Sequence, residues 1–170
     1  IEGALTFSHT LDQPGIFTRN VEDAALLAAA LAGGGVKPSS AVGSRTTAPR
    51  LAALKTPVWN QAEDYARERF GQSVKTLRDG GASVEEVELP EGFGKAHRAI
   101  RTIMAVEAAF NLEALSLAKG HLISSTLRDF IAEGRNTGAV AYLQALQVRR
   151  GLQEELARLF EKYDAAVTLP

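Results

Sequence analysis

The sequence predicts an α/β domain, and three observations support that prediction. Residues 51–89 read as a strand, a helix and a second strand in succession. Residues 95–163 carry apolar side chains at helical spacing, so the C-terminal half is expected to be rich in helix. The run AAVTLP at residues 165–170 is then typical of a short buried strand. Strands alternating with helices predict helices packed against a sheet.

The first elements expected are a loop and a helix, within residues 1–33. Asn20 can cap a helix over residues 21–32, because its side-chain oxygen accepts from an early helical N–H. Gly33 can end that helix in a left-handed conformation. Residues 34–50 hold little that could be buried, and they predict a flexible surface connection.

A strand–helix–strand unit is expected next. Residues 51–59 (LAALKTPVW) predict a strand, although Pro57 favours its end or the edge of a sheet. Residues 61–79 place apolar side chains on one helical stripe, and Gly80-Gly81 ends that helix. Residues 82–90 (ASVEEVELP) alternate apolar and acidic side chains, as a half-exposed strand does. Such a βαβ unit is expected to have a right-handed crossover.

The remaining elements are mostly helical. Lys95 to Ala118 predicts one long helix or two, and residues 126–133 predict a shorter one that begins after Ser124 or Ser125 and is closed by Gly134. A long helix is expected over residues 139–163. Its predicted apolar face comprises Val140, Leu143, Leu146, Leu152, Leu156, Leu159 and Phe160.

The bulk properties exclude several classes of function. The chain has 170 residues, of which 45% are hydrophobic, and its formal net charge is −1, which gives no electrostatic footprint for nucleic acid. No apolar run is long enough to cross a membrane. The sequence contains no cysteine, which mildly favours a cytoplasmic location. Its three histidines do not lie at metal-ligand spacing, so neither a metal nor another cofactor is implied.

Asp12 and Arg19 are the most informative polar pair in the sequence. They flank the turn Pro14-Gly15 just before the first predicted helix. A carboxylate and the rigid guanidinium fork can lock a loop in one geometry, so we interpret the pair as a structural brace. Two alternatives stay open, which are exposure of both side chains to solvent and direct contact with a substrate.

The opening run GALTFSHTLDQPGIFTRNVEDAALLAAALAG resembles the region just after the nucleophile in amidase signature enzymes. That family shows the pattern S-x-T-L-D-x-x-G-x-x-x-R-x-x-x-D-A-A-L-L. The later runs DGGASVEEVELP and FEKYDAAVTLP also fit the family's order of elements, so the resemblance spans nearly the whole chain.

The resemblance implies an α/β/α sandwich around a mixed sheet. It also implies hydrolysis of a carboxamide to a carboxylate and ammonia, through a serine–cis-serine–lysine triad and an acyl-enzyme. The family's lysine and both serines lie in a segment that would precede residue 1, and Ile1 is not methionine. We therefore expect residues 1–170 to be a single partial amidase domain, without catalytic residues of its own and inactive alone.

Two hypotheses follow from the resemblance. In the first, the chain is part of an amidase acting on a small-molecule amide, and its helices at 95–118 and 123–134 help shape the acyl pocket. Met104, Glu107 and Phe110 share one face of the first helix and are candidate pocket residues, although core packing is the favoured explanation for them. In the second, the scaffold is a non-catalytic binding or assembly module. Uncovered sheet edges would favour self-association into a homo-oligomer in either case.

Overall fold

The computed structural model describes residues 3–32 and 47–169. These residues fall into two units, of which one comprises Ile1–Asp12 and Pro49–Pro170 and the other Gln13–Ala48. The second unit contains helix α1 (Val21–Leu31), and the predicted cap is confirmed, since the Asn20 side chain accepts from the N–H of Asp23 at 2.8 Å. The glycine expected to end α1 and most of the predicted connection at 34–50 lie outside the described residues.

Within residues 3–32 and 47–169, three parallel strands form the sheet of the first unit. They are β1 (Arg50–Lys55), β2 (Ser83–Glu88) and β3 (Ala165–Val167), in the order β2-β1-β3. Leu51 lies opposite Val84 on one side and Ala165 on the other. The central strand is buried from Leu51 to Leu54, which explains why its sequence is a continuous apolar run rather than an alternating one.

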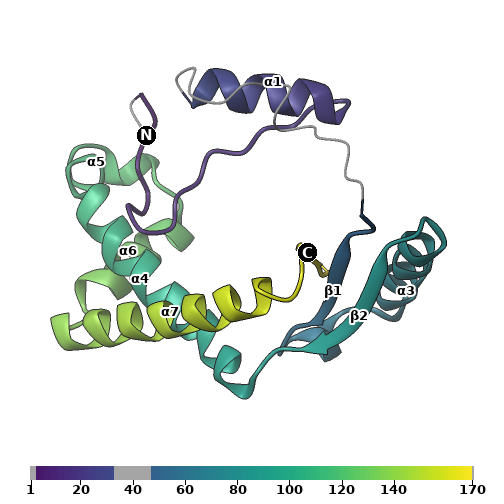
Figure 1. Ribbon diagram of the computed structural model, residues 1–170. Helices are drawn as coiled ribbons and strands as arrows, with labels where there is room; N and C mark the ends of the chain where they lie inside the picture. Colours follow the sequence, from purple (N-terminus) through teal and green to yellow (C-terminus); the bar gives the residue numbers. More distant parts are fainter. Residues whose placement is uncertain (1–2, 33–46, 170) are drawn as a thin grey trace. The chain divides into compact units, whose positions relative to one another are not determined.

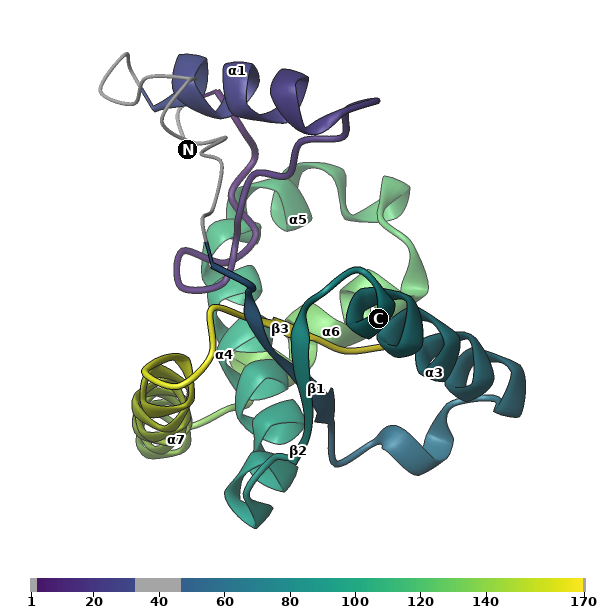
Figure 2. The same cartoon turned by 45° about the vertical axis from the view of Figure 1, so that its right-hand side comes forward.

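The predicted βαβ unit is confirmed, with helix α3 (Asp64–Asp79) between β1 and β2. Figure 2 shows α3 beside β2. The first strand is shorter than expected, because it ends at Lys55 before Pro57, and residues 59–61 form a short 3-10 helix. Gly80 caps α3 as predicted, and Gly81 adopts a φ of +93° that favours glycine.

Asp164 joins the start of β3 to the start of β1. Its carboxylate accepts from the Arg50 N–H at 2.7 Å, and its own N–H donates to the Arg50 carbonyl at 2.8 Å. Asp164, which directly follows the helix expected over residues 139–163, therefore aligns β3 with β1. Along β3, Ala165 is exposed and the next two residues are half-buried, so the strand is less buried than its apolar sequence indicates.

The helical part of this unit is built on α4. The region predicted as one helix or two contains two, α4 (Ala96–Asn111) and α5 (Glu113–Lys119), joined at the buried Leu112. α6 (Ser125–Arg135) and α7 (Ala139–Phe160) both pack against α4 (Figure 1). Two short 3-10 helices, η2 (Glu91–Lys95) and η3 (Gly120–Leu122), precede α4 and α6. This arrangement confirms the helix-rich C-terminal half.

Gly134 does not end α6, so that prediction was wrong. The helix begins after the Ser124 cap, as expected, but it continues to Arg135 and Gly134 lies buried within it. A Cβ built at Gly134 would lie 1.9 Å from the carbonyl oxygen of Ala105 on α4. The glycine is therefore required because two helix backbones approach closely.

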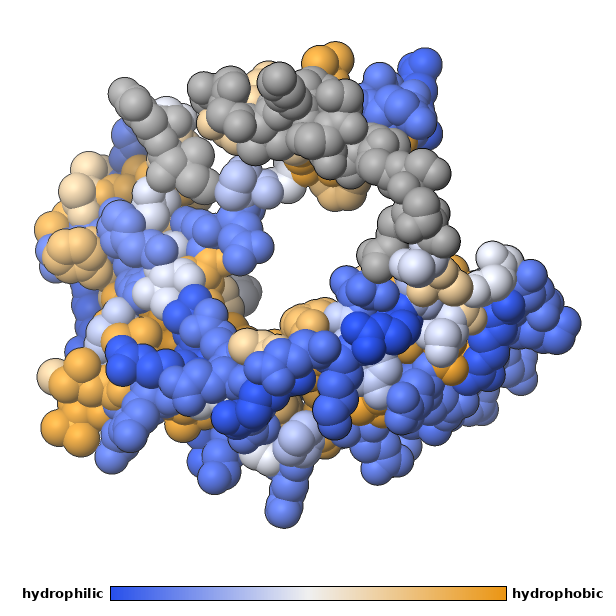
Figure 3. Space-filling model, viewed as in Figure 1, coloured by the Kyte–Doolittle hydropathy of each residue, from blue (hydrophilic) through white to orange (hydrophobic). Residues whose placement is uncertain are grey.

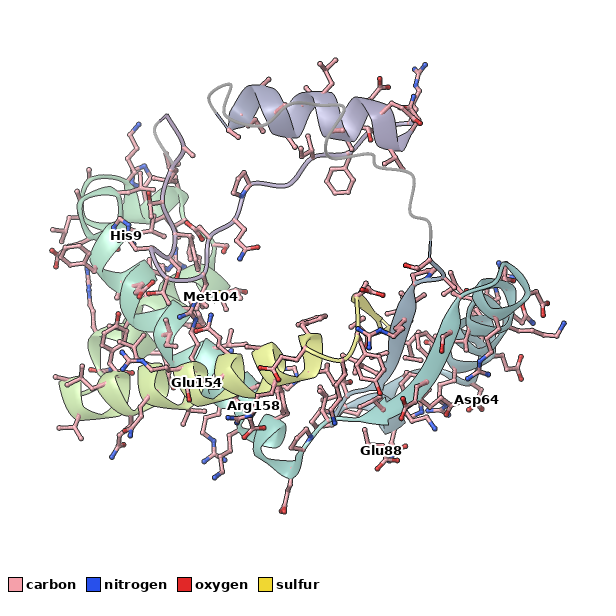
Figure 4. The ribbon with its side chains drawn as sticks, viewed as in Figure 1. His9, Asp64, Glu88, Met104, Glu154 and Arg158 are labelled. Atoms are coloured by element: carbon pink, nitrogen blue, oxygen red, sulfur yellow. The ribbon has the colours of Figure 1, made fainter. Side chains whose placement is uncertain are left out.

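The buried face of α7 also differs from the prediction. Val140 and Leu143 were expected on the apolar face, yet they are 69% and 61% exposed, and Figure 3 shows hydrophobic surface at the start of this helix. Ala145 is buried instead, in a cluster with Ala99 and Ile103 of α4. Leu146 of the predicted face packs against this cluster, so the prediction is confirmed there and wrong at the start of the helix. On the polar side of α7, Glu154 and Arg158 are exposed (Figure 4).

No helix among residues 3–32 and 47–169 is long and apolar enough to cross a membrane.

Candidate functional site

The loop that enters the first unit is folded around the carboxylate of Asp12. One oxygen of Asp12 accepts from the N–H groups of Phe7, at 2.8 Å, and Ser8, at 3.0 Å. The N–H of Asp12 in turn donates to the Ser8 carbonyl at 2.9 Å. Asp12 therefore fixes the backbone of residues 7–12 from within.

A buried carboxylate, Glu107 on α4, holds this loop against the helices. One of its oxygens accepts from the Ser8 hydroxyl at 2.5 Å and from the Thr10 N–H at 2.9 Å. The other accepts from the Thr10 hydroxyl and, at 2.7 Å, from the Tyr142 hydroxyl of α7. These four residues are called the Glu107 network below. A carboxylate has about four acceptor positions, so this one is fully used.

The electrostatics of the network favour a charged Glu107. Its burial acts to raise its pKa, but the hydrogen bonds from Ser8, Thr10 and Tyr142 outweigh burial and hold the pKa below its usual value of 4.5. Burial, together with the bond to Glu107, raises the pKa of the Tyr142 hydroxyl above its usual value of 10.0. At neutral pH the network therefore consists of one carboxylate and neutral donors.

Two further side chains tie the same loop to the helices. The Asn111 amide donates to the Phe7 carbonyl at 3.2 Å, and the Arg149 guanidinium lies 3.4 Å from the Thr10 carbonyl. Asn111 extends from α4 and Arg149 from α7, so both helices contribute to the anchor. The loop thus rests on a platform of two packed helices.

A groove of about 540 Å³ lies beside this platform, where α4, α6 and Phe7 meet. We call it the Met104 groove after the residue labelled on α4 in Figure 4. Phe7 stacks on Phe130 with ring centroids 6.0 Å apart. Arg101 lies 5.2 Å from the centre of the Phe130 ring and makes two hydrogen bonds to Glu133, at 2.9 and 2.5 Å. The groove is therefore lined by apolar side chains and by an ion pair in which the charge of Arg101 is balanced by that of Glu133.

The three candidate pocket residues take different places. Met104 lines the groove and is half-buried, whereas Glu107 is buried in its network, and Phe110 is 76% exposed. The structure therefore does not bring the three together in one pocket.

The predicted brace residues lie in different units. Asp12 belongs to the first unit and acts on its own loop, while Arg19 belongs to the second and is exposed. Pairing of Asp12 with Arg19 stays a prediction.

Comparison with known proteins identifies the chain's relatives. The family model described as Amidase matches residues 2–169. The chain belongs to the amidase family. An amidase of Pseudomonas putida is 28% identical over 186 residues, which cover 99% of this chain and 39% of the relative. A glutamyl-tRNA(Gln) amidotransferase subunit of Thermotoga maritima is 26% identical over 199 residues, which cover 98% and 42%. The chain thus spans about two fifths of the length of these amidase relatives.

Solved structures share the fold of this chain. A crystal structure of an amidase superposes with a TM-score of 0.75 at 23% identity, covering 90% of this chain and 35% of that one. An inhibitor-bound vestigial complex, linked to the origins of an s-triazine catabolic enzyme, gives a TM-score of 0.58 at 23% identity over 68% of this chain and 24% of that one. These likenesses confirm the α/β amidase fold.

Sequence reasoning missed the partners of Glu107 in this amidase domain. Ser8 and Thr10 lie 99 and 97 residues from it, and Tyr142 lies 35 residues away, so no short motif unites them. One signal was present. Glu107 is a lone carboxylate among the alanines of a buried helix face, and such a charge needs partners. Among residues 3–32 and 47–169, no group of three metal-ligating side chains forms.

Proposed function

We propose that this chain is the part of an amide hydrolase that follows its reactive serine segment, and that it is non-catalytic alone. The reaction is hydrolysis of a carboxamide to a carboxylate and ammonia through a serine acyl-enzyme, which divides one difficult step into two easier ones. The observation that supports it best is the match to the amidase family over residues 2–169.

The described polar groups fit a supporting role. Ser8 is fully buried, and its hydroxyl donates to Glu107 while accepting from the Leu11 N–H at 3.2 Å. This hydroxyl has no exposed surface, and the Glu107 carboxylate beside it is a poor base because its pKa is lowered, which argues against Ser8 as a nucleophile. Lys55 pairs with Glu86 at 2.8 Å on the sheet, which argues against a role as the triad base.

The Met104 groove is proposed as a wall of the acyl pocket. Pockets for small molecules are largely apolar with a few polar groups, and Phe7, Met104 and Phe130 supply such a surface here. In the full-length enzyme, Met104→Ala is expected to raise the ratio of kcat/KM for a bulky acyl amide to that for a small one. An unchanged ratio would count against this assignment.

Residues 6–20 are proposed to brace the catalytic segment from behind, with Asp12 and Arg19 as the brace. Arg19→Ala in the full-length enzyme should then lower the thermal midpoint together with turnover. Loss of turnover at an unchanged midpoint would instead favour direct contact between Arg19 and the substrate.

The alternative is a non-catalytic assembly module on the same scaffold. One observation favours it, which is that a relative at 26% identity is named as one subunit of an amidotransferase. The full-length protein distinguishes the two functions through ammonia release from simple carboxamides and through labelling by a serine-reactive probe. If the full-length protein neither releases ammonia nor takes up the label, the hydrolase is refuted and the module is supported.

The non-catalytic role of the chain has its own test. Residues 1–170 alone should release no ammonia, and turnover by the purified chain would overturn that part of the proposal. The control is Ser8→Ala in the full-length enzyme, which should still take up one label, because Ser8 is not the nucleophile.

A further inference from the structure

Glu107 is a buried acid that the proposed hydrolysis does not use. It is 7% exposed, and it joins three segments that are distant in sequence, since it lies on α4 and bonds both the 8–10 loop and α7. Burying a carboxylate is costly unless it is well satisfied, so its retention at this position requires an explanation.

The geometry argues against direct contact between Glu107 and a substrate. Each carboxylate oxygen already accepts two hydrogen bonds, three of the four from Ser8 and Thr10 and one from Tyr142. A substrate donor would have to displace one of these partners, and the displaced group would be left unsatisfied in a buried place. Protonation of Glu107 would likewise break one of these hydrogen bonds, because the new O–H would face a group that already donates to the carboxylate.

We propose that Glu107 is a positioning residue for the amide hydrolysis, because it fixes Ser8 and Thr10 and thereby the loop that continues from the reactive serine segment. The inference rests on the proposed function. Asn111 and Arg149 hold carbonyls of the same loop, so residues 7, 8 and 10 are each hydrogen-bonded to the α4–α7 platform. A displacement of the helices is therefore passed to the catalytic segment.

The network offers variants of graded severity. Glu107→Gln keeps the shape but replaces one acceptor oxygen by an NH₂ group, which must face either the Thr10 N–H or two hydroxyls. Tyr142→Phe removes only the bond from α7 to Glu107 and leaves the three bonds from the loop, and the Arg149 contact with Thr10, in place. The first variant disturbs the loop itself, and the second disturbs its attachment to one helix.

The test uses the full-length enzyme and counts competent sites with a stoichiometric serine-reactive probe. We expect Glu107→Gln to lower kcat per labelled serine by about tenfold or more, since a small misplacement of reacting groups has a large effect on rate. KM should stay within about twofold, because no substrate contact is removed. Tyr142→Phe should show a smaller fall of the same kind, and Glu86→Gln, which breaks an exposed pair on the sheet, should match the wild type.

The outcomes separate the inference from the proposed function. If kcat per labelled serine is unchanged in both Glu107→Gln and Tyr142→Phe, the network only stabilises the fold and the inference is overturned, while the hydrolase stands. If Glu107→Gln yields no folded protein, Tyr142→Phe decides alone by the same criterion. A wild-type enzyme with neither turnover nor labelling would overturn the proposed function and this inference together.

Discussion

Replacement of Gly134 by alanine tests the close approach between α6 and α4. The added Cβ would lie 1.9 Å from the carbonyl oxygen and 2.4 Å from the carbonyl carbon of Ala105, and 2.9 Å from the Cβ of Ala109. Two of these three atoms are backbone, so no side chain can rotate to make room. The helices must separate for the methyl group to fit.

The magnitude follows from two opposing effects. A carbon atom and a carbonyl oxygen in contact are normally about 3.3 Å apart, so α6 has to move away from α4 by more than about 1 Å. Overpacking of this kind costs about 1–3 kcal/mol, and contact with backbone places Gly134→Ala at the upper end. Alanine favours the helix over glycine by about 1 kcal/mol. We therefore expect a net loss of about 2 kcal/mol in the free energy of unfolding.

Urea unfolding followed by far-UV circular dichroism measures this loss. The matched control is Gly71→Ala on α3, where an added Cβ meets nothing within 4 Å. Only helix propensity acts at that position, so Gly71→Ala should gain about 0.5–1 kcal/mol. If Gly134→Ala were as stable as the wild type while the control gained stability, the close approach of α6 to α4 would be refuted.

Three further substitutions probe other parts of the chain. Glu107→Gln should destabilise the fold most above pH 4.5, and its difference from the wild type in free energy of unfolding should shrink at lower pH. The reason is that the pKa of Glu107 is lower in the folded state, so the unfolded chain takes up the proton first as the pH falls. A difference in urea unfolding that does not vary with pH would contradict this. Asp164→Ala removes the acceptor of the Arg50 N–H and should cost about 1 kcal/mol, with faster hydrogen exchange in β3; unchanged exchange there would argue against the link. Asn20→Ala should cost α1 about 1 kcal/mol, seen as faster exchange of its first amides, whereas Asn20→Ser should have little effect.

Much of the fold was predictable because its signals are local. The Asn20 and Ser124 caps, the βαβ unit and the glycines after α3 each depend on residues within one turn or one strand. Such signals act on the backbone before any tertiary contact forms, so the sequence carries them directly.

The errors arose where a distant contact decides the outcome. Gly134 reads as a helix stop, but the backbone of α4 determines its role. On α7, the large side chains of Val140 and Leu143 indicate a buried face, yet the helix packs through the small Ala145. Small residues permit close helix approach, and their burial is invisible to a count of large apolar positions.

The candidate site was predictable only in part. The resemblance drew attention to the loop and to the region around Met104, and the structure places a groove there. The Glu107 network depends on bonds between residues 97 and 99 positions apart, which no spacing rule reveals.

The sheet has a consequence for how the protein is made. β1 pairs with β2 through one intervening helix, but it pairs with β3 across 114 residues. Closing so long a loop is slow, so we expect the βαβ unit to form early on the ribosome and the third strand to join late. Until then β1 lacks its β3 neighbour, so we expect aggregation through this strand edge to be most favoured during that interval.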